Sequence, residues 1–111
     1  MAGVSVETRA PDGKVISFAV INLSASGSIV AGVAGQTIRV YRLFMSVNTV
    51  TNTVQFTDGT TNFTGVMTLA QGTPLNLNFD GTPWFTCAVG NGFSVVLAGG
   101  QTSGALYFTQ S

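Results

Sequence analysis

Residues that could carry chemistry are few in this sequence and far apart. The 111 residues include no histidine, one cysteine (Cys87), and eight charged side chains, four acidic and four basic. Without histidine, the commonest general base is missing, and so are the Ser-His-Asp and Cys-His arrangements. One cysteine without histidine supplies no zinc ligand set and permits no internal disulfide. We therefore expect no catalysis, no metal and no cofactor.

The acidic and sulfur-containing side chains have structural interpretations. Asp58 and Asp80 each precede a glycine, and aspartate at such a position is first of all a turn former. Calcium would require clustered oxygen ligands, and no D-x-D run is present. Cys87 lies in the apolar run WFTCAV, which predicts a buried small hydrophobic side chain rather than a nucleophile.

The overall composition is apolar and poor in charge. Hydrophobic residues make up 45% of the chain and charged residues 7%, whereas a soluble domain is usually about 25% charged. One interpretation is a small β protein with a surface of Thr, Ser, Asn and Gln. The other, which we favour, is a chain whose surface is largely covered by partners, because interface cores are depleted in charge. The four cations (Arg9, Lys14, Arg39 and Arg42) form no basic tract, so no nucleic-acid groove is expected.

The N-terminal sequence and the apolar runs predict neither a secretory signal nor a membrane span. MAGVSVETRAPDG has no apolar segment behind a basic start, as a signal peptide would. No apolar run approaches the ~18 residues that a transmembrane helix needs.

The clearest structural element is Thr37–Thr57, in which apolar residues recur at every second position. This alternation predicts two long strands with one face in a core, joined by a tight turn near Asn48. The phase slips by one residue between Val40 and Leu43, which predicts a β-bulge at Tyr41–Arg42. A ladder of polar residues is predicted to form the outward face of the second strand: Thr49, Thr51, Thr53, Gln55 and Thr57.

The rest of the chain also alternates in short segments separated by turn residues, and no segment has a helical period. Eight to ten short strands with turns every 8 to 12 residues predict an all-β, antiparallel β-sandwich. A jelly roll is the expected type, and closure into a barrel is the alternative. Outside the central stretch, the predicted strands are 14–23, 28–33, 65–70, 75–79, 84–89, 93–97 and 103–109.

We interpret residues 1–22 as an N-terminal extended arm and residues 23–111 as the sandwich domain. The arm is too apolar for a solvated tail, so we predict that it packs against a neighbouring subunit and adds a strand to an exposed sheet edge. The alternative is that part of it, KVISFAVI, forms the first strand of its own sandwich.

Aromatic side chains are the remaining candidates for recognition. Eight of the eleven are Phe, which usually packs in cores. The amphipathic rings are Tyr41, Tyr107 and Trp84, and Trp84 could be a core residue, an interface anchor or a platform for a sugar. The predicted interface combines residues of the arm with cations and with Trp84. Its members are Val4, Val6, Arg9, Lys14, Ile16, Phe18, Arg39, Arg42 and Trp84.

From about Ile29 onward the order of features resembles small β-sandwich virion proteins of tailed bacteriophages, in particular jelly-roll capsid decoration (cement) proteins. The element from Trp84 to Gly90 and the closing GALY strand are its most distinctive parts. The segments that carry the resemblance are Ala34–Val40, Val54–Gly59, Phe63–Gly65, Pro83–Thr86, Gly90–Val95 and Gly104–Tyr107.

The resemblance implies a non-enzymatic structural protein, made in the host cytoplasm, that binds the outside of a phage capsid and stabilises it. Its partners would be the major capsid protein and further copies of itself, as a trimer or less favourably a dimer, with no nucleic acid and no membrane. The alternative is a carbohydrate- or receptor-binding module of a tail fibre or baseplate, which would require a solvent-exposed aromatic ring.

Overall fold

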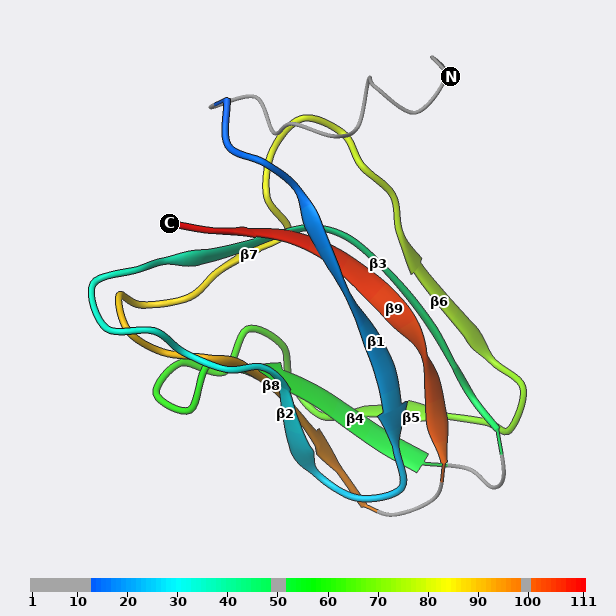
Figure 1. Ribbon diagram of the computed structural model, residues 1–111. Coiled ribbons are helices and arrows are strands. Elements are labelled where there is room, and N and C mark those ends of the chain that lie inside the picture. The colour runs from blue at the N-terminus through cyan, green and yellow to red at the C-terminus, as the bar shows by residue number, and fades with distance from the viewer. Residues whose placement is uncertain (1–12, 49–51, 99–100) are drawn as a thin grey trace.

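The computed structural model of the protein describes residues 13–48, 52–98 and 101–111. This part of the chain contains nine β-strands and no helix (Figure 1). The strands are β1 (Ser17–Leu23), β2 (Gly27–Val30), β3 (Ile38–Val47), β4 (Asn52–Thr57), β5 (Met67–Leu69), β6 (Pro74–Leu77), β7 (Phe85–Thr86), β8 (Phe93–Leu97) and β9 (Thr102–Gln110).

The strands form two antiparallel sheets that pack face to face, which confirms the predicted β-sandwich. The five-stranded sheet has the order β1-β9-β3-β6, with β7 also pairing with β3, and the four-stranded sheet has the order β2-β8-β4-β5. The antiparallel pairs β1/β9, β2/β8, β3/β6 and β4/β5 are nested in the sequence. The chain therefore follows the path of one long hairpin that is rolled up so that β9 meets β3 and β8 meets β4.

The central stretch is not the hairpin that its alternation suggested. β3 and β4 lie in different sheets and face each other across the core, so both can bury their apolar sides against one another. The bulge prediction is confirmed, because the pairing with β9 shifts between Val40 and Arg42. Tyr41 is the extra residue, and the shift keeps Val40 and Leu43 both facing inward, where each is fully buried.

Four phenylalanine rings form a cluster that includes two core residues, Phe56 and Phe93, and two half-buried ones, Phe63 and Phe85. Phe56 of β4, Phe85 of β7, Phe93 of β8 and Phe63 of the loop after β4 contact one another, with ring centroids 5.3 to 6.2 Å apart. Rings at such separations contribute attraction beyond the area they bury. The cluster joins the two sheets and fixes β7, a strand of only two residues, against β3.

The N-terminal segment contributes a strand to the sandwich of its own chain. Ser17–Leu23 pairs with β9 along its whole length, and Ile21 is buried in the core beside the half-buried Ala19. A neighbouring subunit is therefore not what orders residues 17–22, and the predicted boundary at residue 22 falls inside a strand. Residues 1–12 lie outside the described part of the chain.

The predicted polar ladder on β4 is more enclosed than expected. Thr53 and Gln55 are half-buried. Thr57 is buried, and its hydroxyl donates to the Thr61 carbonyl while accepting from the Gly59 amide. These bonds hold the turn that follows β4, because a threonine hydroxyl can replace backbone partners in a turn. Thr49 and Thr51 are not among the described residues.

Candidate interaction surface

The outer face of the five-stranded sheet carries an aromatic row that crosses three strands. Phe18 of β1 lies opposite Tyr107 of β9, and Tyr107 lies opposite Arg42 of β3. The Phe18 and Tyr107 ring centroids are 6.1 Å apart. Residues directly opposite on neighbouring strands have side chains on the same face of a sheet. The strand pairing therefore brings together side chains that are 24 to 89 positions apart in the sequence.

The Arg42 guanidinium lies between two aromatic rings of this face. Its central carbon is 5.5 Å from the centre of the Tyr107 ring and 5.9 Å from that of Phe44. A cation within about 6 Å of a ring centre is attracted by the negative ring face. These two rings hold the positive charge of Arg42 over the sheet. A partner that bound here could therefore contact apolar and cationic side chains on the same surface.

A second row lies beside the first and is almost entirely apolar. It runs from Val20 on β1 through Ala105 on β9 to Phe44 on β3. Exposed fractions are 65% for Phe18, 64% for Val20 and 38% for Phe44. We call Phe18, Val20, Phe44, Ala105 and Tyr107 together the apolar face.

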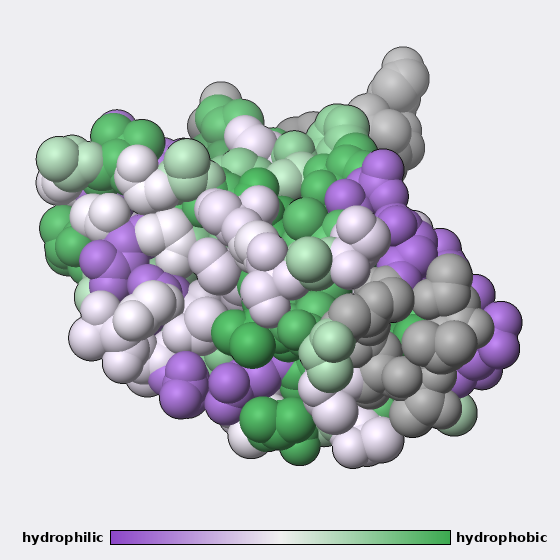
Figure 2. Space-filling model, turned by 90° about the horizontal axis from the view of Figure 1, so that it is seen from below, coloured by the Kyte–Doolittle hydropathy of each residue, from purple (hydrophilic) through white to green (hydrophobic). Residues whose placement is uncertain are grey.

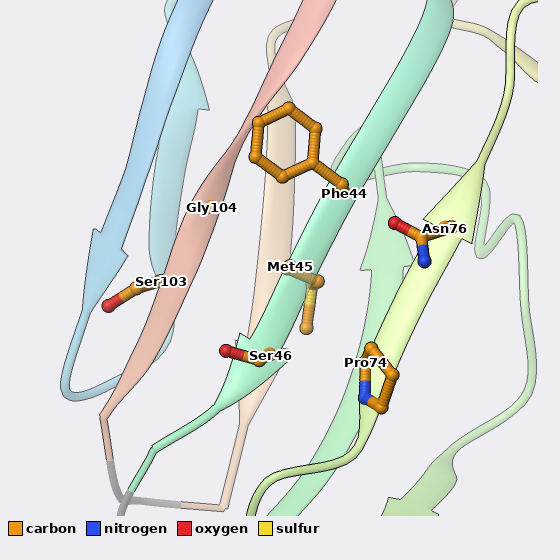
Figure 3. Close-up of a pocket in the computed structure, with 7 residues that line it drawn as sticks. All are labelled: Phe44, Met45, Ser46, Pro74, Asn76, Ser103 and Gly104. Carbon is orange, nitrogen blue, oxygen red and sulfur yellow. The ribbon is translucent and has the colours of Figure 1, made fainter.

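A shallow hollow of about 330 Å³ opens at the edge of the apolar face. Figure 3 shows the Phe44 ring on β3 projecting on the side of Gly104, while Pro74 and Asn76 lie on β6. A Cβ atom at Gly104 would lie 1.9 Å from the Phe44 carbonyl oxygen, so the missing side chain is what allows β9 and β3 to approach here. The remaining lining residues are Met45, Ser46 and Ser103.

Polar side chains cross the sheet at one end of the hollow, and two of them, Ser46 and Ser103, also line it. The Ser46 hydroxyl donates to the Asn48 amide oxygen, and the Asn48 amide nitrogen donates to the Ser103 hydroxyl at 2.8 Å. The Gln101 amide donates to Asn22 on β1. This hydrogen-bonded row borders the apolar face at one end of the sheet. Figure 2, seen from that end, shows a surface mostly of intermediate hydropathy, with separate hydrophobic patches and several hydrophilic groups.

Trp84 is not the core residue that was one interpretation of the sequence. Its side chain is 42% exposed, and its indole Nε1 donates to the Asn78 carbonyl at 2.7 Å. Its backbone nitrogen donates to the Val40 carbonyl beside the bulge. The core position is occupied instead by Phe85, the next residue, because alternation along β7 turns its ring toward the phenylalanine cluster.

Asp58 and Asp80 both hold turns, as predicted. One carboxylate oxygen of Asp58 accepts from the backbone amides of Thr60 and Thr61, and the other accepts from the amide of Ala88, 30 residues away. Burial acts to raise the pKa of Asp58, but these bonds and one from Asn91 outweigh it and lower the pKa below 3.8. Asp80 accepts from the Thr82 amide in an exposed turn.

Cys87 is buried, as predicted. Burial, assisted by the negative charge of Asp58, raises the pKa of its thiol to about 11. The thiolate is the reactive form of cysteine, so the raised pKa keeps this thiol in its less reactive, protonated form near neutral pH. In the described ranges no group of three or more His, Cys, Asp or Glu side chains is arranged to hold a metal ion.

Of the predicted interface residues, the structure brings Phe18 and Arg42 together, with Tyr107 between them. Arg39 is half-buried on the other side of the bulge, opposite Thr109 and Thr86. Lys14 is exposed and Ile16 half-buried, both just before β1. Val4, Val6 and Arg9 lie outside the described residues.

Four members of the apolar face were absent from the predicted interface: Val20, Phe44, Ala105 and Tyr107. The alternation of inward and outward side chains along each strand could have revealed their outward positions. With Leu43 and Met45 facing inward after the bulge, Phe44 must face outward, and Val20 follows in the same way from Ala19 and Ile21. Tyr41, another predicted candidate for sugar contact, is buried with its ring 6.0 Å from that of Phe79.

The sequence matches no protein-family model, and no curated protein matches it significantly. In structure the chain is similar to a protein of Bacillus endospore appendages, which are described as a novel family of disulfide-linked pili. The two chains are 18% identical and superpose with a TM-score of 0.52 over 86% of this chain and 85% of the other. At this level of identity the likeness shows the β-sandwich fold alone. The described part of the chain has no helix long and apolar enough to cross a membrane.

Proposed function

We propose that this protein is a non-enzymatic structural protein of a tailed-phage particle, a decoration protein that binds the outer shell of the capsid and stabilises it. The observation that carries the proposal is the apolar face, where Phe18, Val20 and Phe44 are exposed on one rigid sheet. Contiguous apolar surface on a soluble chain marks an interaction site. Aromatic residues and arginine are the side chains enriched in such interfaces.

The nested strand pairing supports the jelly roll that was predicted. The implied partners are the major capsid protein and further copies of this chain. A trimer is favoured by the resemblance, and a dimer is the alternative. Stabilisation would follow from mass action, because a protein that binds the assembled shell and not its separated subunits shifts the equilibrium toward the shell. The low charge of the chain is in keeping with such a covered surface.

The structural similarity to a pilus protein supports a subunit of an ordered assembly. The linkage would differ, however. The sequence has one cysteine, and Cys87 is buried with a raised pKa. Contacts between subunits of this protein are therefore expected to be non-covalent and to depend on apolar burial.

The proposal is tested by adding purified protein to undecorated phage capsids. Bound protein should sediment with the capsids and raise the temperature at which they break apart. Phe44→Ser, which removes an exposed ring from the apolar face, should weaken binding. Val66→Ser, which removes an exposed side chain outside that face, should leave it unchanged. The proposal fails if wild-type protein neither sediments with the capsids nor protects them.

A second function, carbohydrate or receptor binding, is favoured by the exposure of Trp84. The indole is held in place by its bond to Asn78, and Asp80 lies in the neighbouring turn. A fixed aromatic plane beside amide and carboxylate groups can stack on a sugar and bind its hydroxyls. Binding to a glycan array that is lost in Trp84→Ala would support this function, and an array without signal would exclude it for the glycans tested.

A further inference from the structure

The described strands give the two sheets four edges, one of them shared by β6 and the two-residue β7. Three of these edges carry features that discourage pairing with another chain. Unpaired strand edges are protected in natural proteins by short length, proline or bulges. β5 has three residues, and β6 has four and begins with Pro74. β2 has four residues and its pairing register shifts between Ser28 and Val30.

The fourth edge, β1, has none of these features. It is seven residues long, and its sequence SFAVINL contains neither proline nor charge. Its register with β9 is uninterrupted from Ser17 to Leu23, so its backbone is regular enough to serve as a template. Among the described strands it pairs with β9 alone. It also carries Phe18 and Val20, whose side chains are about two-thirds exposed.

We propose that β1 is a self-association edge, and that its occupant is β1 of a second copy of this chain, aligned antiparallel about a two-fold axis. The joint would merge the two five-stranded sheets into one continuous sheet. A two-fold contact is self-complementary, so one patch serves both partners. This inference deepens the proposed function by choosing a dimer, the alternative given above, over the trimer that the resemblance favours. It can be tested without a particle, so it does not depend on whether the chain binds capsids.

The side chains of β1 suit this pairing. With Ala19 at the axis, Phe18 of each copy lies opposite Val20 of the other, and all four side chains lie on the outer face. Aromatic residues paired with β-branched residues are favourable partners across strands. No like charges would meet within the joint, since Ser17–Leu23 is uncharged. The apolar face would also become continuous across the two copies.

The size of the contact predicts a weak dimer. With Ala19 at the axis, Ser17–Ile21 of the two strands overlap, and five residues span about 17 Å. The contact therefore buries on the order of 400 Å² in total, below the about 1,200 Å² of stable interfaces. We expect dissociation in the range of tens to hundreds of micromolar. Such a contact would gain strength in an assembly, where several weak contacts act together.

Analytical ultracentrifugation of the full chain, from about 5 to about 500 µM, tests the inference. Wild-type protein should shift toward twice the 11.4 kDa chain mass as concentration rises. Val20→Lys should raise the dissociation constant at least about tenfold, because an edge lysine blocks strand pairing. Val66→Lys is the matched control, since both valines are 64% exposed, and it should behave as wild type. A wild-type monomer throughout, a trimer, or equal dimerisation of both variants would overturn the inference.

Hydrogen exchange on the wild-type protein gives the same test without a variant. The amides of β1 should become more protected between the lowest and highest concentrations, while those of the protected edge β6 should not change. Concentration-independent exchange in β1 would contradict the proposed pairing, even if Val20→Lys failed to fold.

Discussion

The Asp58 carboxylate offers the sharpest test of how the loops of this sandwich are held. It joins the turn after β4 to the segment after β7, by accepting from Thr60, Thr61 and Ala88. In Asp58→Asn the amide oxygen can still accept from the two local amides. The amide nitrogen, however, must then face the Ala88 N–H, and two donors repel. The substitution should therefore break the contact between the loops while leaving the local turn intact.

The expected cost of Asp58→Asn follows from the bonds that are lost. A hydrogen bond to a charged group is worth about 1.5 to 3 kcal/mol. The two local bonds survive in weaker form, and water can reach the exposed Thr60 and Thr61. We therefore expect the free energy of unfolding to fall by about 2 to 3 kcal/mol at pH 7. Urea unfolding followed by circular dichroism would measure it.

Asp80→Asn is the matched control, because Asp80 holds an exposed turn with one backbone amide. Its effect should stay within about 0.5 kcal/mol. The pH dependence adds an independent check. Since folding lowers the pKa of Asp58 below 3.8, its stabilisation is present above that pH and is lost as the pH falls through the lowered value. The gap between wild type and Asp58→Asn should therefore be constant near neutrality and shrink below about pH 4. Equal effects of the two substitutions at pH 7 would refute the assigned role of Asp58.

Two further outcomes are expected from the packing. Gly104→Ala should cost about 2 to 3 kcal/mol in urea unfolding, because its Cβ would press on the Phe44 carbonyl. Gly65→Ala, where the added Cβ meets nothing within 4 Å, should stay within about 0.5 kcal/mol, and equal costs would contradict the close approach. Cys87, buried and with a pKa of about 11, should resist a thiol reagent at pH 8 in folded protein and react fully in guanidinium chloride. Rapid labelling of the folded protein would show that the thiol is accessible.

Much of the fold could be predicted from the sequence because alternation reports which face of a strand is buried. It located the strands, and the phase slip between Val40 and Leu43 located the bulge. Alternation carries no information about which strand is the partner. Two inward-facing strands joined by a short connection can pair as a hairpin or face each other across a core, and β3 and β4 do the latter.

Only part of the candidate surface was predicted, because alternation does not show which strands lie side by side. Phe18 and Arg42 were expected at an interface, but the expectation that Phe fills the core hid Phe44. Its outward position depends on the bulge, which shifts the alternation of the strand by one residue. Trp84 shows that residue type alone does not predict which side chain is buried, since Phe85 occupies the core position beside it. What brings the surface together is the pairing of β1 and β3 with β9, which sequence spacing does not record.

The most direct test of the proposed decoration function is to heat undecorated capsids with and without saturating wild-type protein and follow their disruption. We predict bound protein in the capsid pellet and a higher disruption temperature, with Phe44→Ser protecting less well than Val66→Ser. Capsids that break apart at the same temperature, with no bound protein in the pellet, would contradict the proposal.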